Sequence, residues 1–125
     1  MKKSLLLIIL FISASISFGD EPVRETRAVW ITTNYALDWP PKTYDEEKQK
    51  SALRKIFEDL SQKYFNTVYF QVRSNGTTCY FSDIEPFSPY FAGKVGKRSG
   101  YDPLQFAIEL GQEYNIEVHA WVNMV

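Results

Sequence analysis

Three segments of the chain alternate between apolar and mixed side chains with a period of two, which predicts β-strands with unlike faces. The segments are residues 24–33, 65–73 and 116–125. In the middle segment, Val68, Phe70 and Val72 form a wholly apolar face. The opposite face carries hydroxyl, aromatic, amide and guanidinium groups, on Thr67, Tyr69, Gln71 and Arg73. We therefore expect helices to cover the apolar face, and a lumen, a cleft or water to meet the other face.

Residues 43–64, between the first two strands, predict an amphipathic helix. Apolar side chains recur there with helical spacing, at Leu53, Ile56, Phe57, Leu60 and Tyr64. Thr43 and Glu46 fit the capping-box pattern, in which each side chain binds a free backbone N–H of the first turn. The sequence thus predicts a helix that begins at Thr43 and buries one stripe.

A second helix is predicted to follow Asp102, before the third strand. Asp102 is the expected N-cap, and Pro103 suits the first helical position because the N–H that it lacks has no partner there. The expected buried stripe comprises Leu104, Ala107, Ile108, Gly111 and Tyr114. Because glycine is unfavourable within a helix, Gly111 predicts close packing against a strand.

The order strand, helix, strand, helix, strand predicts a parallel α/β fold with right-handed crossovers. A doubly wound sheet would need two aliphatic faces, but each strand here has one face with polar or aromatic groups, at Trp30, Thr32, Tyr69, Gln71, Arg73, His119, Trp121 and Asn123. This pattern favours the βαβαβ opening of a (β/α)8 barrel. A barrel needs about 250 residues, so we expect an amino-terminal portion that does not fold stably alone.

Residues 74–100 form a long connection rich in aromatic side chains. Long connections are usually functional or disordered, and the aromatic content argues for an ordered loop over one end of the sheet. Asp83 and Glu85 lie in it, either as surface acids or as an acid/base pair. Cys79 is expected to be a semi-buried side chain rather than a nucleophile, since the sequence offers no neighbouring base.

The first 19 residues have the pattern of a secretory signal peptide. A cationic start, Met1-Lys2-Lys3, precedes an apolar run, and small residues precede a cut before Asp20. The apolar run is short for a membrane span, so we expect no stable membrane anchor. Residues 20–125 are then the mature chain, which is exported to the periplasm or the cell exterior.

Charge and composition narrow the function further. The formal net charge is −1, with no basic patch for nucleic acid. Aromatic residues make up 16% of the chain, which suits either a ring-rich core or flat surfaces for sugars. One histidine and scattered acids give no metal-ligand spacing, so no metal or other cofactor is expected.

Five ordered motifs resemble the glycosyl-hydrolase-like 10 family, also called DUF187. They are residues 27–31 with 38–40, residues 65–73, residues 84–88, residues 100–104 and residues 119–123. The resemblance implies a (β/α)8 barrel that hydrolyses O-glycosyl bonds in a polysaccharide, with peptidoglycan glycan strands among the candidates. It also implies that the family's acidic strand-four motif lies beyond Val125, so the catalytic residues are not assigned here.

Glycoside hydrolysis usually needs two carboxylates across the scissile bond, so this portion is expected to supply a wall that holds sugar. The candidate substrate-binding residues are Gln71, Arg73, Asn123, Trp121, His119, Trp30, Asn34 and Asp38. For each the alternative is structural: a hydrogen-bonded lumen network, core packing or loop bracing. Two functions remain open, a secreted glycoside hydrolase and a non-catalytic glycan-binding relative or remnant.

Overall fold

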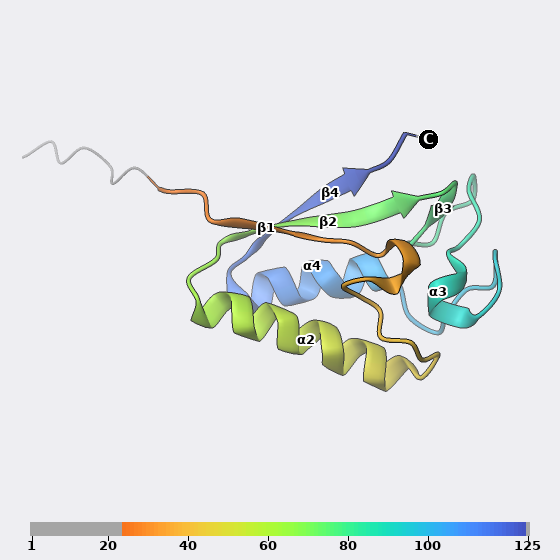
Figure 1. Ribbon diagram of the computed structural model, residues 1–125, viewed down its shortest axis with the longest axis horizontal. Coiled ribbons are helices and arrows are strands. Elements are labelled where there is room, and N and C mark those ends of the chain that lie inside the picture. Colours follow the sequence, from red (N-terminus) through yellow and green to blue (C-terminus); the bar gives the residue numbers. More distant parts are fainter. Residues whose placement is uncertain (1–23, 125) are drawn as a thin grey trace, which may run out of the picture.

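The computed structural model describes residues 24–124 of the chain (Figure 1). The predicted signal peptide, residues 1–19, lies outside this range. The strands are β1 (Ala28–Ile31), β2 (Thr67–Ser74), β3 (Thr77–Thr78) and β4 (Glu117–Val122). The helices are η1 (Asn34–Ala36), α2 (Glu46–Gln62), α3 (Pro89–Ala92) and α4 (Pro103–Tyr114). β1 and β4 both pair with β2 in parallel, which confirms the predicted βαβαβ order and the α/β class.

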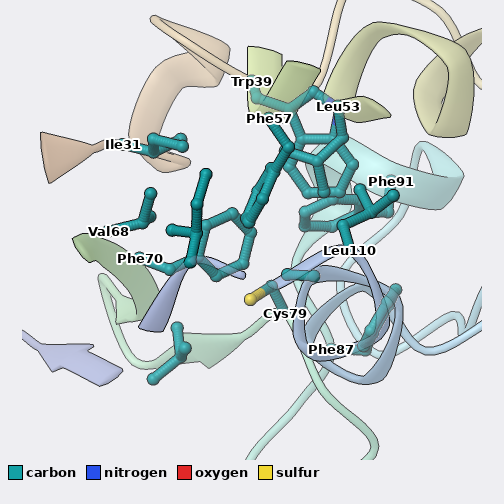
Figure 2. Packing of buried hydrophobic residues seen from close by; sticks show 13 residues of the cluster. Ile31, Trp39, Leu53, Phe57, Val68, Phe70, Cys79, Phe87, Phe91 and Leu110 are labelled. Atoms are coloured by element: carbon teal, nitrogen blue, oxygen red, sulfur yellow. The ribbon is translucent and has the colours of Figure 1, made fainter. Parts of the chain in front are cut away.

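Helices α2 and α4 lie side by side on one face of this sheet, and the described part of the chain leaves the other face open (Figure 1). Val68, Phe70 and Val72 of β2 are buried on the helix-covered face. Figure 2 shows the core that forms there, with side chains from β2, α2, α4 and the loop that follows β1, including Phe70, Phe57, Leu110 and Trp39. The prediction that helices cover the apolar face is therefore confirmed.

Helix α2 begins later than predicted. Its N-cap is Asp45, whose carboxylate accepts a hydrogen bond from the backbone N–H of Lys48 at 3.2 Å. The capping box from Thr43 to Glu46 was wrong: Thr43 instead accepts from the backbone N–H of Asp45. Tyr64 does not join the buried stripe, because it follows the helix end with a φ of 62° and is 78% exposed.

Helix α4 begins as predicted but buries a slightly different stripe. Asp102 is its N-cap and accepts from the backbone N–H of Gln105 at 3.0 Å. Leu110 is fully buried, whereas Ile108 was wrongly expected to be buried and is 37% exposed. Gly111 packs against the start of β4 so closely that an added Cβ would lie 2.7 Å from the Ile116 carbonyl oxygen, which confirms the predicted close approach.

The connection between β2 and α4 is an ordered structure with its own hydrogen bonds, as predicted. Asn75 and Gly76 turn the chain so that β3 pairs antiparallel with the end of β2. The backbone of Thr78 also binds that of Pro86 and Ser88, at 3.0 and 2.9 Å. This hairpin was not predicted from the sequence, although Asn-Gly is the strongest short-range signal for one.

Strand β4 forms one edge of the described sheet. Val118 packs against the core, but Ala120 and Val122 are exposed, although the alternation predicted an apolar face for all three. The physical reason is that α4 contacts the start of β4, where Gly111 lies against Ile116 and Val118, and the described residues leave Ala120 and Val122 uncovered.

Candidate functional site

Aromatic rings from all three parallel strands meet on the open face of the sheet. Trp30 of β1 stacks on Tyr69 of β2 with ring centroids 4.6 Å apart, and it meets Trp121 of β4 edge-on at 5.0 Å. His119 lies 5.4 Å from the Tyr69 ring. The parallel register sets this arrangement, because it aligns Trp30, Tyr69 and His119 across the sheet. Since Trp30 is 58% exposed, the group offers a flat apolar surface.

Arg73 forms the polar centre at the carboxyl edge of the sheet, the edge where β1, β2 and β4 end. Its Nε donates to both carboxylate oxygens of Glu85 at 2.9 and 2.8 Å, and its Nη2 donates to Oε1 at 2.6 Å. Its Nη1 donates to the backbone carbonyl of Asn123. The guanidinium therefore joins the end of β2, the long connection and the end of β4.

This pairing fixes the charge state of Glu85 and leaves part of Arg73 available. Hydrogen bonds from Arg73 lower the pKa of Glu85, so the carboxyl stays ionised and is a poor proton donor near neutral pH. A guanidinium has five N–H donors, and the bonds within the described residues use one each on Nε, Nη1 and Nη2. The remaining N–H groups on Nη1 and Nη2 suit a ligand hydroxyl or carboxylate.

Gln71 is buried under the turn that follows β1, where its amide binds the start of the 3-10 helix η1. Its Oε1 accepts from the Thr32 hydroxyl at 2.6 Å and from the backbone N–H groups of Thr33 and Asn34, each at 2.9 Å. Only 1% of the residue is exposed. The amide thus holds the turn after β1, a structural role that differs from the lumen network expected as its alternative, and its contact with a substrate stays a prediction.

Asn34 and Asp38 both lie in the segment that follows β1, but their side chains make different contacts. Asn34 accepts a side-chain hydrogen bond from Asn75 at 2.7 Å, which links the loops after β1 and β2. Asp38 accepts from the backbone N–H of Thr32 at 2.8 Å and closes its own loop. Trp39 is fully buried and donates to the Gln49 carbonyl, so it braces the loop.

The other polar candidates are accessible. The Asn123 side chain is half-buried and makes no hydrogen bond to another described residue, while its backbone binds Arg73. His119 is exposed, and its Nε2 lies 3.5 Å from Glu117 on the same strand. These positions agree with a ligand-facing role for both residues, which remains a prediction.

Sequence reasoning missed Glu85 as the partner of Arg73, because it had assessed Glu85 only beside Asp83. The structure separates these acids: Asp83 is fully exposed and pairs with Arg98. Cys79 is buried more deeply than expected, and burial raises the pKa of its thiol, which argues against a nucleophile. Within residues 24–124 no cluster of three metal-ligating side chains occurs, and no helix is long and apolar enough to cross a membrane.

Chemically, the described residues can bind a ligand that is both flat-faced and rich in hydroxyl groups. The aromatic group offers ring faces, and Arg73 offers charged hydrogen-bond donors near the end of β2, the strand that carries Tyr69. Among the described residues, the one carboxylate bound in this polar centre is Glu85, which is held by Arg73. The geometry therefore supports holding and orienting a ligand.

Comparison with known proteins identifies a family and relatives for this chain. Residues 25–125 match the family described as glycosyl hydrolase-like 10. Glycosyl hydrolase YngK of Bacillus subtilis (strain 168) is 36% identical over 121 residues, which is 96% of this chain. Glycosyl hydrolase DigH of Escherichia coli (strain K12) is 37% identical over 105 residues, or 78% of this chain.

The chain spans 24% of the length of each of these two relatives. The family match covers nearly all of the described residues and includes β1, β2, α4 and β4. Both relatives align over more than two thirds of this chain at more than 30% identity. The chain therefore belongs to the glycosyl hydrolase-like 10 family.

Proposed function

We propose that residues 20–125 supply the first strands of a (β/α)8 barrel in an exported glycoside hydrolase. The observation that carries the proposal is the family match over residues 25–125. The parallel order β1–β2–β4, with helices on one face, supports the barrel, in which the open aromatic face would look inward. Residues 1–19 act as the leader that directs export, on the basis of their sequence pattern.

In this proposal the carboxyl edge of the sheet holds a polysaccharide, with peptidoglycan glycan strands as the first candidate. Active sites of such barrels lie at the carboxyl ends of the strands, where Arg73 and Asn123 are located. Trp30 and Trp121 stack on sugar rings, and the unused N–H groups of Arg73 bind hydroxyl or carboxylate groups. The two carboxylates of glycoside hydrolysis come from strands that follow in the full-length protein.

The test is release of reducing ends from purified peptidoglycan glycan strands by the full-length protein. Arg73→Ala should lower kcat/KM at least about tenfold, a loss of about 1.4 kcal/mol of transition-state binding. Arg54→Ala is the matched control, because Arg54 also pairs with a glutamate, Glu113, but on the outer surface between α2 and α4. Its kcat/KM should equal that of the wild type.

Two results would contradict the proposal. Full activity in Arg73→Ala would remove this residue from the site. Retention of the wild-type protein on glycan strands, without new reducing ends, would support the non-catalytic glycan-binding alternative instead.

A further inference from the structure

A hollow of about 530 Å³ lies beside the carboxyl edge, between η1, the segment before α2, and α3. We call it the tyrosine hollow, because three of its lining residues are tyrosines from three separate segments. Its lining includes Tyr35, Tyr44, Tyr90, Pro41, Lys42 and Thr43. The candidate residues of the sequence analysis do not line it.

Tyr35 is held at this hollow by an unusual backbone. Tyr35 and Ala36 have φ values of 54° and 51°, in the left-handed region that non-glycine residues rarely adopt. The Gln71 amide and the buried Trp39 brace this turn, and they leave the Tyr35 side chain 66% exposed. Backbone conformations of this kind are concentrated at ligand sites, so the turn points to a function for the exposed ring.

The other two rings are positioned by α3. Tyr90 lies on this helix, and its ring centroid is 6.4 Å from that of Tyr35. Tyr44 lies against Gly93, the C-cap of α3, where an added Cβ would be 3.2 Å from the Tyr44 ring. Gly93 thus allows the close approach of a ring that stays 65% exposed.

The chemistry of the lining suits a sugar better than an apolar ligand. Aromatic faces accept the C–H face of a pyranose, while Lys42 and Thr43 can bind its hydroxyl groups. Lys42 is exposed and makes no hydrogen bond or salt bridge with another described residue, so its ammonium is available. The volume lies within the range of small-molecule sites, about 300–1,000 Å³.

The tyrosine hollow is also linked to the proposed cleft. Tyr35 directly follows Asn34, whose backbone N–H binds Gln71 and whose side chain binds Asn75. We propose that the tyrosine hollow is an outer subsite that stacks one pyranose of a glycan whose other sugars occupy the cleft at Arg73. This inference rests on the proposed function. It adds a site that strengthens the binding of long glycan chains relative to short ones.

The experiment measures binding of two probes to the full-length protein: a disaccharide and a longer oligosaccharide, both from peptidoglycan glycan strands. Tyr35→Ala and Tyr44→Ala should each weaken binding of the long probe about fivefold to tenfold and leave the disaccharide unchanged. Tyr35→Phe keeps the ring and should bind as the wild type does. Tyr64→Ala is the matched control, an exposed tyrosine at the opposite end of α2.

Three outcomes would overturn the inference. If the alanine variants bind the long probe as tightly as the wild type, the subsite is wrong while the proposed function stands. If the wild type binds neither probe, the proposed function fails and the subsite fails with it. If Tyr35→Ala and Tyr44→Ala lower Tm far more than Tyr64→Ala does, another part of the protein covers these rings instead of a sugar.

Discussion

The side chains of Arg73 and Glu85, 12 residues apart in the sequence, meet through three hydrogen bonds of 2.6–2.9 Å. Arg73 is the penultimate residue of β2, whereas Glu85 lies in the long connection that follows. The pair therefore attaches this connection to the sheet at the point where the proposed cleft begins. It also has a consequence for the pH dependence of stability.

We expect Glu85→Gln to make the melting temperature depend less on pH in the acidic range. Because Arg73 lowers the pKa of folded Glu85, the pair stabilises the protein fully above the ordinary glutamate pKa of about 4.3. That contribution is lost as the pH falls through the lower folded-state pKa. The Tm difference between the wild type and Glu85→Gln should be constant near pH 7 and shrink below about pH 4.3.

Thermal melts between pH 2 and 8 provide the measurement. Asp83→Asn is the control, since it removes a carboxylate from the same connection but one that is fully exposed. Its Tm profile should follow that of the wild type. A Tm difference for Glu85→Gln that grows towards low pH would contradict the assigned pairing.

Gly111→Ala should destabilise the protein although alanine favours helices. The new Cβ would lie 2.7 Å from both the Ile116 carbonyl oxygen and Cγ2 of Val118. Overpacking of this kind costs about 1–3 kcal/mol, against a gain of up to about 1 kcal/mol in helix propensity. Urea unfolding should show a lower free energy of unfolding for this variant.

The neighbouring exposed Gln112 supplies the control for that experiment. Gln112→Ala should change the free energy of unfolding by less than about 0.5 kcal/mol. If Gly111→Ala were as stable as Gln112→Ala, the helix and strand would be farther apart than described.

Gln71→Leu should destabilise the turn after β1. The leucine leaves the buried backbone N–H group of Thr33 and the partly buried one of Asn34 without their acceptor. Each buried unsatisfied group costs about 1–3 kcal/mol, so we expect a loss of about 2–5 kcal/mol in the free energy of unfolding. Urea unfolding of the variant and the wild type measures this loss.

Gln105→Leu is the matched control, because Gln105 is exposed on α4 and bonds only Glu109 through its side chain. It should lose less than about 0.5 kcal/mol. Equal losses in the two variants would show that the Gln71 amide does not hold the turn.

Cys79 should resist thiol reagents in the folded protein. It is 2% exposed, and burial raises the pKa of its thiol, so little thiolate is present at neutral pH. Ellman's reagent should therefore react slowly under native conditions and rapidly in denaturant. Fast reaction in the native state would contradict the burial of this side chain.

The faces of the strands could be predicted from sequence because period two is a local property. Val68 and Phe70 are fully buried beneath the helices, as their alternation indicated. The N-cap role of Asp102 could also be predicted from sequence, since an N-cap depends on a few neighbouring residues. The exact start of α2 could not be predicted, because Asp45 and Thr43 are both good caps and the path of the preceding loop decides between them.

Long-range pairings could not be derived from the pattern. Nothing local distinguishes Glu85 from Asp83, and only the folded connection brings Glu85 to Arg73. The tyrosine hollow likewise joins Tyr35, Tyr44 and Tyr90 from three segments. The exposure of Ile108 in place of Leu110 depends on how α4 is rotated about its own axis against the sheet, which helical spacing alone does not set.

The β3 hairpin gives the proposed cleft a preformed wall. Thr78 is bonded on both sides, to the end of β2 through the strand pairing and to Pro86 and Ser88 through backbone bonds. A segment anchored in this way need not lose further backbone entropy when a ligand arrives. Selectivity at this wall would therefore come from a shape that exists in advance, and a sugar chain would have to adapt its own torsions to it.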